Sequence, residues 1–311
     1  MPNASNRKAQ NASHPIYIAY ELWLQQVYAK GCSPKTLSTY RELVEPFVLH
    51  LCRHAPDLDS VTPLHVMEYL SQRRARGLSS HTVHSDYQKA RVFWNWCLRM
   101  ELTANNPFAK VPTPKREQVL KPALTPEQVE ALLRACEGKE WHRLRDRALI
   151  LLLLDTGVRI HEALNLRVCD VIQETLLVKG KGGKHRLVPL SAEVRLALQR
   201  YLKACPFKPK SEQPLWYGEY GALTLEGIEV VVRKIGKRAG LRLGAHQLRR
   251  TFATWSLRSG IDLHRLQMLM GHSDLRTTQQ YLALLEEDLK QAHEQHSPLN
   301  LLRTVRRAQT R

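Results

Sequence analysis

The chain has 311 residues and a formal net charge of +18, from 47 Lys and Arg against 29 Asp and Glu. Its six cysteines (32, 52, 97, 136, 169 and 205) form no C-x-x-C pair, which argues against a zinc site or a disulfide framework and favours a reducing cytosol. The longest apolar run, Ala148 to Leu154, is far too short to span a bilayer, and no secretory signal is recognised. We therefore expect a cytoplasmic protein with no membrane partner. When bound to its partner it would be associated with the bacterial nucleoid.

The positive charge is spread over both halves of the chain. Residues 1–122 carry 16 basic and 9 acidic side chains, a net charge of +7, and residues 123–311 carry 31 and 20, a net charge of +11. Two basic domains joined by a linker suit a clamp around a polyanion, with DNA or RNA the best candidates. A soluble basic protein without such a partner is the simpler alternative.

Helix signals dominate residues 14–106, which follow a polar tail at 1–13 that we expect to lack regular structure. Helices are predicted at 16–30, 34–52, 63–76 and 80–97. Ser33-Pro34 and Thr62-Pro63 provide a capping residue followed by proline at the first helical position. Basic residues on these helices could follow a DNA backbone, although an ordinary solvated helix face explains any single one of them.

Four prolines in residues 107–122 predict an extended linker. The capping box Thr125 to Gln128 then opens a second domain, 123–296, followed by a basic tail at 297–311. Its predicted helices are 126–137, 141–154, 192–202, 223–239, 246–259, 261–270 and 277–294. A β-hairpin is predicted at 175–190, around the glycine-rich turn 179–184. The fold class is therefore mainly α (α+β), with one small antiparallel sheet.

Two short segments, Thr156 to Arg159 and His246 to Arg249, supply a pair of arginines. The planar guanidinium binds two phosphate oxygens at once and does not deprotonate, as stabilising a phosphodiester requires. Arg159 follows a Thr-Gly turn, so its head can emerge at a domain surface, while His246 and Arg249 share a helix face. Either arginine taken alone is better explained as a surface ion-pair partner, and only its occurrence together with the other segments favours phosphate binding.

A third segment, Gly271-His272 with Tyr281 nine residues later, supplies a nucleophile. An ordinary tyrosine pKa near ~10 leaves about one molecule in 10³ ionised at neutral pH, a deficit of roughly 4 kcal/mol. A nearby base and the field of the arginines must make up that deficit, and His272 and His246 are the candidates. Tyr281 taken alone would be a core aromatic residue, but the ordered set of segments favours catalysis.

Two further residues complete the candidate site. Lys181, at the tip of the hairpin, can donate a proton to a leaving 5′ oxygen, although Lys179 and Lys184 lie close enough to be confused with it. The alternative is a basic hairpin that only contacts phosphates. Glu162 lies three residues after Arg159 and can orient a catalytic cation, or form a helix-face salt bridge.

The series TGVRIHEAL, VKGKGGKHRLVPL, HQLRRTFAT and LMGHSDLRTTQQYLAL resembles the tyrosine recombinase (phage integrase) family, in a style close to the Xer-type recombinases. The resemblance covers most of residues 14–296 and implies a helical SAM-like core-binding domain followed by a catalytic domain. It implies site-specific breakage and rejoining of double-stranded DNA. Implied roles are phosphate binding by Arg159 and Arg249, general acid for Lys181, the two histidine positions for His246 and His272, and 3′-phosphotyrosine formation by Tyr281.

The same resemblance implies how the reaction is organised. The 5′-hydroxyl of a partner strand attacks the phosphotyrosine, so no cofactor and no metal are needed. Four protomers assemble on paired recombination sites and exchange strands through a Holliday junction, with an accessory directionality factor as a further partner. His161 stands where serine or alanine is common, and Arg250 where histidine is frequent; neither departure removes a catalytic group.

Three other functions compete with recombination. A DNA-binding regulator could use residues 263–282 as a helix-turn-helix, but it leaves Arg159 and Lys181 unexplained. A type IB topoisomerase shares the phosphotyrosine chemistry and would relax DNA without sequence preference. A hydrolytic nuclease would need a carboxylate cluster for metal, and the sequence pattern indicates none.

Overall fold

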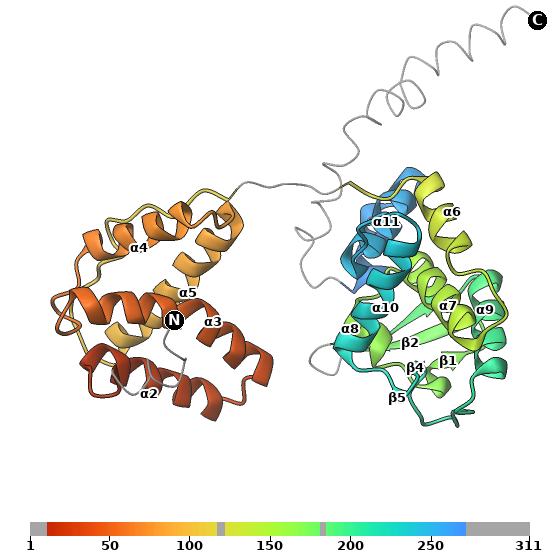
Figure 1. The fold of residues 1–311 in the computed structure, drawn as a ribbon, viewed down its shortest axis with the longest axis horizontal. Helices are drawn as coiled ribbons and strands as arrows, with labels where there is room; N and C mark the ends of the chain where they lie inside the picture. The colour runs from red at the N-terminus through yellow and green to blue at the C-terminus, as the bar shows by residue number, and fades with distance from the viewer. Residues whose placement is uncertain (1–10, 117–121, 181–184, 272–311) are drawn as a thin grey trace, which may run out of the picture. The chain divides into compact units, whose positions relative to one another are not determined.

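The computed structural model describes residues 11–116, 122–180 and 185–271 (Figure 1). The chain divides into two compact units, residues 1–119 and 120–311, and each has its own hydrophobic core. Among the residues described, no helix is both long enough and apolar enough to cross a membrane.

The N-terminal unit is built from helices whose starts the sequence encodes with capping residues and prolines. Within residues 11–116 these include α2 (Pro15–Ala29), α3 (Pro34–His54), α4 (Pro63–Ala75) and α5 (Ser80–Arg99). The side chains of Ser33 and Ser79 accept hydrogen bonds from the backbone N–H groups of Thr36 and Thr82, which satisfies donors that a helix start leaves unpaired. The four predicted helices are confirmed, with ends that shift by a few residues at most.

Aromatic side chains fill the core of this unit. Tyr20, Phe47, Phe93 and Trp94 are all fully buried. Phe108 and Val111, inside the stretch that its prolines mark as a linker, are also buried against this core. The hydroxyl of Tyr87 donates to the carbonyl of Val111 at 3.0 Å, so the first part of that stretch belongs structurally to the N-terminal unit.

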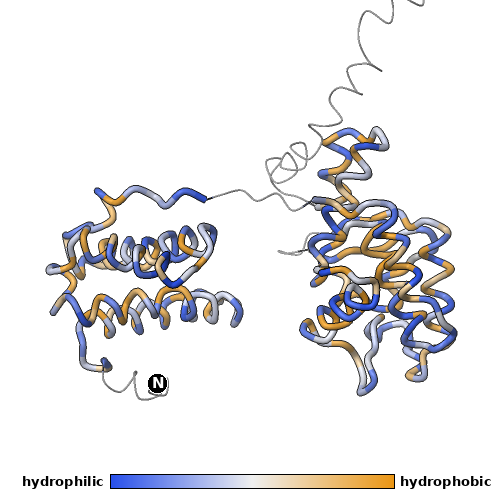
Figure 2. Tube along the Cα trace, turned by 45° about the horizontal axis from the view of Figure 1, so that its top comes forward, coloured by the Kyte–Doolittle hydropathy of each residue, from blue (hydrophilic) through white to orange (hydrophobic). Residues whose placement is uncertain are grey.

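The C-terminal unit surrounds one apolar helix. Its helices are α6 (Pro126–Arg134), α7 (Trp141–Thr156), α8 (Ile160–Leu164), α9 (Ala192–Ala204), α10 (Leu225–Arg238), α11 (Ala245–Arg258) and α12 (Leu263–Met270). The apolar run predicted as a buried helix lies in α7, where residues 148–153 are buried, and α7 packs against α9 and α11. Figure 2 shows hydrophobic and hydrophilic residues interleaved along the helices of both units, as expected for helices with one face in a core.

A three-stranded antiparallel sheet carries the predicted hairpin. The order is β1 (Val171–Ile172), β2 (Thr175–Lys179) and β3 (His185–Pro189), and Leu176 pairs with Val188 while Val178 pairs with Arg186. The hairpin is confirmed. Strand β1 and a second small sheet, β4 (Tyr217–Gly218) with β5 (Gly221–Ala222), were not predicted, because two residues are too few to show an alternating pattern. The predicted helix at 277–294 lies outside the described residues.

Candidate active site

Arg159 is presented by a sharp turn at the end of α7. Gly157 ends the helix with φ of 59°, and a Cβ atom there would lie 2.1 Å from Cδ1 of Phe252 on α11. Glycine is therefore required both for the left-handed conformation and for the close approach of α11. The turn delivers Arg159 to the first position before α8, and its side chain is 44% exposed.

Glu162 holds Arg159 through both its backbone and its side chain. Its Oε2 accepts the backbone N–H of Arg159 at 2.9 Å, and its Oε1 accepts the Arg159 side chain at 3.1 Å. Arg186 binds the same carboxylate with two hydrogen bonds of 3.1 and 2.9 Å. Burial alone would raise the pKa of Glu162, but the hydrogen bonds and charges of Arg186 and Arg159 outweigh burial and lower it. The carboxylate is therefore ionised at neutral pH and binds two guanidinium groups.

Arg186 was not among the candidate residues, although the sequence held a signal for it. In the hairpin, Val178 and Arg186 are directly opposite each other, and opposite residues point to the same face of a sheet. Val178 is buried, so the hairpin register places Arg186 on the inward face. A charged residue at an inward position needs a buried partner, and Glu162 is that partner.

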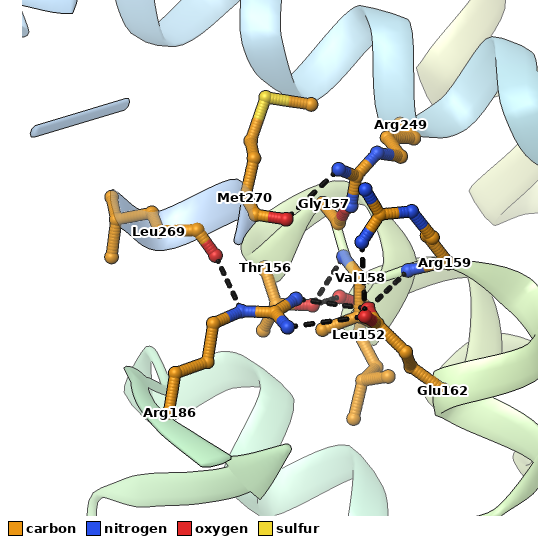
Figure 3. A network of polar contacts seen from close by, with 10 residues as sticks. All are labelled: Leu152, Thr156, Gly157, Val158, Arg159, Glu162, Arg186, Arg249, Leu269 and Met270. Atoms are coloured by element: carbon orange, nitrogen blue, oxygen red, sulfur yellow. Dashed lines mark hydrogen bonds and ion pairs between the residues drawn. The ribbon is translucent and has the colours of Figure 1, made fainter. Parts of the chain in front are cut away.

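Arg249 lies deeper than Arg159 and connects three elements. It is 3% exposed and donates to the carbonyl oxygens of Gly157 and of Met270, the latter at 2.9 Å. The first contact joins α11 to the turn before Arg159, and the second joins α11 to the end of α12. In Figure 3 the Arg249 and Arg159 side chains both run toward the Gly157 turn from the same side of the view.

His246 stands one helical turn before Arg249 on α11. It is exposed, yet partial burial of the ring, followed by the charges of Arg250, Arg249 and Arg159, lowers its pKa. Near pH 7 the ring is therefore mainly neutral and able to accept a proton. Arg250, the departure noted from the usual histidine, adds one of the charges that keep it neutral.

The same arginines fix the end of α12. Nε of Arg186 donates to the carbonyl of Leu269 at 2.9 Å, next to the Met270 carbonyl that Arg249 holds. Gly271 follows with φ of 63°, and a Cβ atom there would lie 2.7 Å from Nη1 of Arg186. The two arginines thus bind the carbonyl groups just before Gly271, and glycine at that position permits the close approach of Arg186.

The structure brings Arg159, Glu162, His246 and Arg249 together. Lys181, His272 and Tyr281 lie outside the described residues. Lys179 and Lys184 are the two other hairpin lysines that could take the role of Lys181. Lys184 also lies outside the described residues, while Lys179 forms an ion pair of 3.0 Å with the buried Asp170. The structural engagement of Lys179 makes it the weaker candidate for a proton donor.

Comparison with known proteins relates both units to the phage integrase family. The model of the phage integrase family matches residues 122–288, and the model of the phage integrase N-terminal SAM-like domain matches residues 21–101. The chain is 34% identical over 286 residues to tyrosine recombinase XerC of Chromobacterium violaceum, covering 90% of this chain and 94% of that protein. It is 32% identical over 286 residues to tyrosine recombinase XerD of Ralstonia nicotianae, covering 89% and 91%.

Solved structures agree with this assignment. A crystal structure of the XerH site-specific recombinase bound to palindromic difH substrate, a post-cleavage complex, superposes with a TM-score of 0.69 at 26% identity, covering 85% of this chain and 80% of that one. The fold and the arginine-rich site, together with these relatives, define an enzyme of DNA strand exchange rather than a regulator or a topoisomerase. The chain belongs to the phage integrase family and is a tyrosine recombinase.

Proposed function

We propose that this chain performs site-specific recombination of double-stranded DNA, with Tyr281 as nucleophile and Arg159, Lys181, His246, Arg249 and His272 as its catalytic partners. The observation that carries the proposal is the gathering of Arg159, Arg249 and His246 around the turn at Gly157, with Glu162 and Arg186 holding that turn. The roles of Lys181, His272 and Tyr281, which lie outside the described residues, rest on the family relationship.

The two arginines have different tasks in this proposal. Arg159 is half exposed and held by Glu162, so its guanidinium binds the scissile phosphate as DNA arrives. Arg249 is buried on two carbonyl oxygens, and a charged phosphate oxygen exchanges for one of those weaker, neutral acceptors. Binding of the phosphate is then coupled to the end of α12, whose Met270 carbonyl shares the same guanidinium.

The chemical step transfers a phosphoryl group without external energy. The phenolic oxygen of Tyr281 attacks phosphorus, forming a 3′-phosphotyrosine bond, and the bond to the 5′ oxygen breaks. Lys181 protonates the leaving oxygen, while His246 or His272 takes the phenolic proton. The 5′-hydroxyl of a partner strand reverses these steps, which returns the tyrosine unchanged.

The assembly follows from needing two DNA sites. We propose residues 14–106 as the core-binding domain, 107–122 as the connecting segment, whose first part packs on that domain, and 123–296 as the catalytic domain, with both domains binding DNA. Four such protomers on paired sites exchange strands through a Holliday junction, and an accessory factor sets direction. The solved relatives bound to substrate DNA support the first part of this proposal.

The covalent intermediate tests the mechanism. The protein is incubated with labelled fragments of the DNA that flanks its gene, and denaturing electrophoresis with peptide mapping locates the adduct. We expect a 3′-phosphate adduct at Tyr281 that Tyr281→Phe abolishes while DNA binding persists. Tyr220→Phe is the matched control, because Tyr220 is fully exposed in the β4–β5 turn, and it should cleave normally.

Two results would count against the proposal. An adduct that survives in Tyr281→Phe would place the nucleophile elsewhere. Relaxation of supercoiled plasmids that lack any recombination site, at the rate seen with the site, would favour topoisomerase activity instead.

A further inference from the structure

The end of α3 and the middle of α4, in the unit that lacks the active-site cluster, bring two histidines and a carboxylate together. His50 and His54 are one helical turn apart on α3, and Glu68 projects from α4. One ligand atom of each of the three lies within 4.8 Å of the others. The ring centroids of His50 and His54 are 4.5 Å apart, so the two imidazoles lie side by side and can bind the same ion.

We propose that His50, His54 and Glu68 bind one divalent transition-metal ion, with Zn²⁺ the best match. Two imidazoles and one carboxylate are a donor set that suits zinc and, with less selectivity, cobalt or nickel. Ligand atoms around tetrahedral zinc are about 3.3 Å apart, given metal–ligand bonds of about 2.0 Å. His54 and Glu68 are exposed, so rotation of these two side chains closes the remaining gap onto the buried His50.

His50 is held as metal-binding histidines commonly are. Its Nε2 lies 3.1 Å from the carbonyl oxygen of His65, and because a carbonyl only accepts, Nε2 is the donor. In the neutral ring the lone pair is then on Nδ1, available to a metal, while the backbone carbonyl orients the ring. His65 is not the fourth ligand, because its Nδ1 accepts the backbone N–H of Thr62 at the start of α4.

A simpler explanation accounts for the parts but not for the set. Histidines near a helix C-terminus interact favourably with the helix dipole, and Glu68 accepts a hydrogen bond from Gln72 at 3.3 Å on its own helix. Neither effect requires a buried histidine, an exposed histidine and a carboxylate from a second helix to converge. A metal ion uses all three at once.

The bound ion would act as a structural clamp. It would join α3 to α4 across the loop 55–62, and its ligands converge only when both helices are packed. An ion that binds the folded state but not the unfolded chain stabilises the fold in proportion to its occupancy. Three protein ligands leave a position for water, so we expect a reversible site rather than one that the chain needs in order to fold.

Metal titration of the full chain tests the clamp separately from recombination. Chelator-treated protein without an affinity tag is dialysed against Zn²⁺, and Co²⁺ provides a visible spectrum that reports nitrogen and oxygen ligands. We expect wild type to bind one equivalent more than His54→Ala or Glu68→Gln, or to bind it at least about tenfold more tightly. Zn²⁺ should also raise the thermal midpoint of wild type, and not that of the variants.

The matched control is His81→Ala, an exposed histidine on α5 of the same unit, which should bind like wild type. Circular dichroism confirms that the variants fold, as expected for exposed positions. Equal binding by all four proteins would overturn the site. Loss with His54→Ala but not with Glu68→Gln would also overturn it, because the carboxylate would then be no ligand.

Discussion

Each unit buries a carboxylate against arginine, and the two sites differ in how many arginines they use. Asp86, fully buried in the N-terminal unit, pairs with Arg73 alone at 2.6 Å, and its Oδ1 has no hydrogen-bond partner within the described residues. Glu162 in the C-terminal unit binds both Arg159 and Arg186. Burial therefore raises the pKa of Asp86 despite Arg73, whereas two arginines overcome burial and lower that of Glu162.

The difference separates a structural ion pair from a binding site. The pair in the N-terminal unit is electrically neutral, so it closes a core and offers nothing to a ligand. The group around Glu162 has one surplus positive charge, and Arg249 on the neighbouring helix adds a second. A buried carboxylate that fixes surplus guanidinium groups in place can present them to a phosphate without the cost of ordering them at that moment.

Arginine-to-lysine changes at the two sites should break this comparison most clearly. Arg249→Lys keeps the charge but loses the planar fork that joins Gly157 to Met270, so we expect the rate of covalent adduct formation to fall by about 10²–10³-fold. Arg73→Lys should lower it by less than about tenfold. Single-turnover cleavage measures both rates, and similar losses in the two variants would contradict the distinction.

Glycine-to-alanine changes come next. Gly31 and Gly157 both have positive φ, but a Cβ atom at Gly31 meets nothing within 4 Å while one at Gly157 meets Phe252. Gly31→Ala should lower the free energy of unfolding by about 1 kcal/mol, from backbone strain alone. Gly157→Ala adds a clash and should cost about 3 kcal/mol. Urea unfolding gives both values, and equal costs would show that Phe252 yields without penalty.

Neutralising each buried carboxylate should have a smaller effect. Glu162→Gln leaves Arg159 and Arg186 without their shared counter-charge, and we expect a loss of about 2 kcal/mol in unfolding free energy. Asp86→Asn removes a charge that burial already disfavours, so about 1 kcal/mol is expected. Chemical denaturation at pH 7 measures the difference, and a reversed order would mean that Arg73 alone stabilises its partner better than two arginines do.

Much of the fold was predictable because its signals are local. Proline at the first helical position, serine caps and three-to-four spacing located α3, α4 and α5 within a few residues. The short helix α8 was not among the predicted helix ranges and strand β1 was not predicted, since five and two residues are too few to establish a repeating pattern. Their positions are fixed by tertiary contacts instead, as with α8, which begins where the Gly157 turn releases the chain.

The candidate site was predictable only where residue type implied chemistry. Arg159, Glu162, His246 and Arg249 were selected for their reactivity, and the structure brings them together. Arg186 was missed because its importance depends on hairpin register and on a partner distant in sequence. The histidine pair on α3 is visible in the sequence at one-turn spacing, but Glu68 joins it only through the packing of α4. Lys181, His272 and Tyr281 stay predictions.

Acidification should produce the smallest effect and the most specific one, because the two carboxylates respond in opposite directions. The pKa of Glu162 lies below its ordinary 4.5 in the folded state, so its contribution to stability is complete above about pH 4.5 and is lost as pH falls through the folded pKa. The pKa of Asp86 lies above its ordinary 3.8, so its folded form takes up a proton first, and the cost of keeping it ionised disappears as pH falls through that raised pKa.

Hydrogen exchange, corrected for the intrinsic pH dependence, can resolve these two responses in one intact chain. From about pH 5 down to the lowest pH at which the chain stays folded, amides of α5, which carries Asp86, should lose less protection than amides of α7 and α8, which flank the Gly157 turn. Other carboxylates contribute to both units, so the variants isolate the two groups: Glu162→Gln should flatten the acid-induced loss in α7 and α8, and Asp86→Asn should leave that loss unchanged. If Glu162→Gln instead steepens it, the fold raises the pKa of Glu162 rather than lowering it, which contradicts the role of this carboxylate as the anchor that holds Arg159 toward a phosphate.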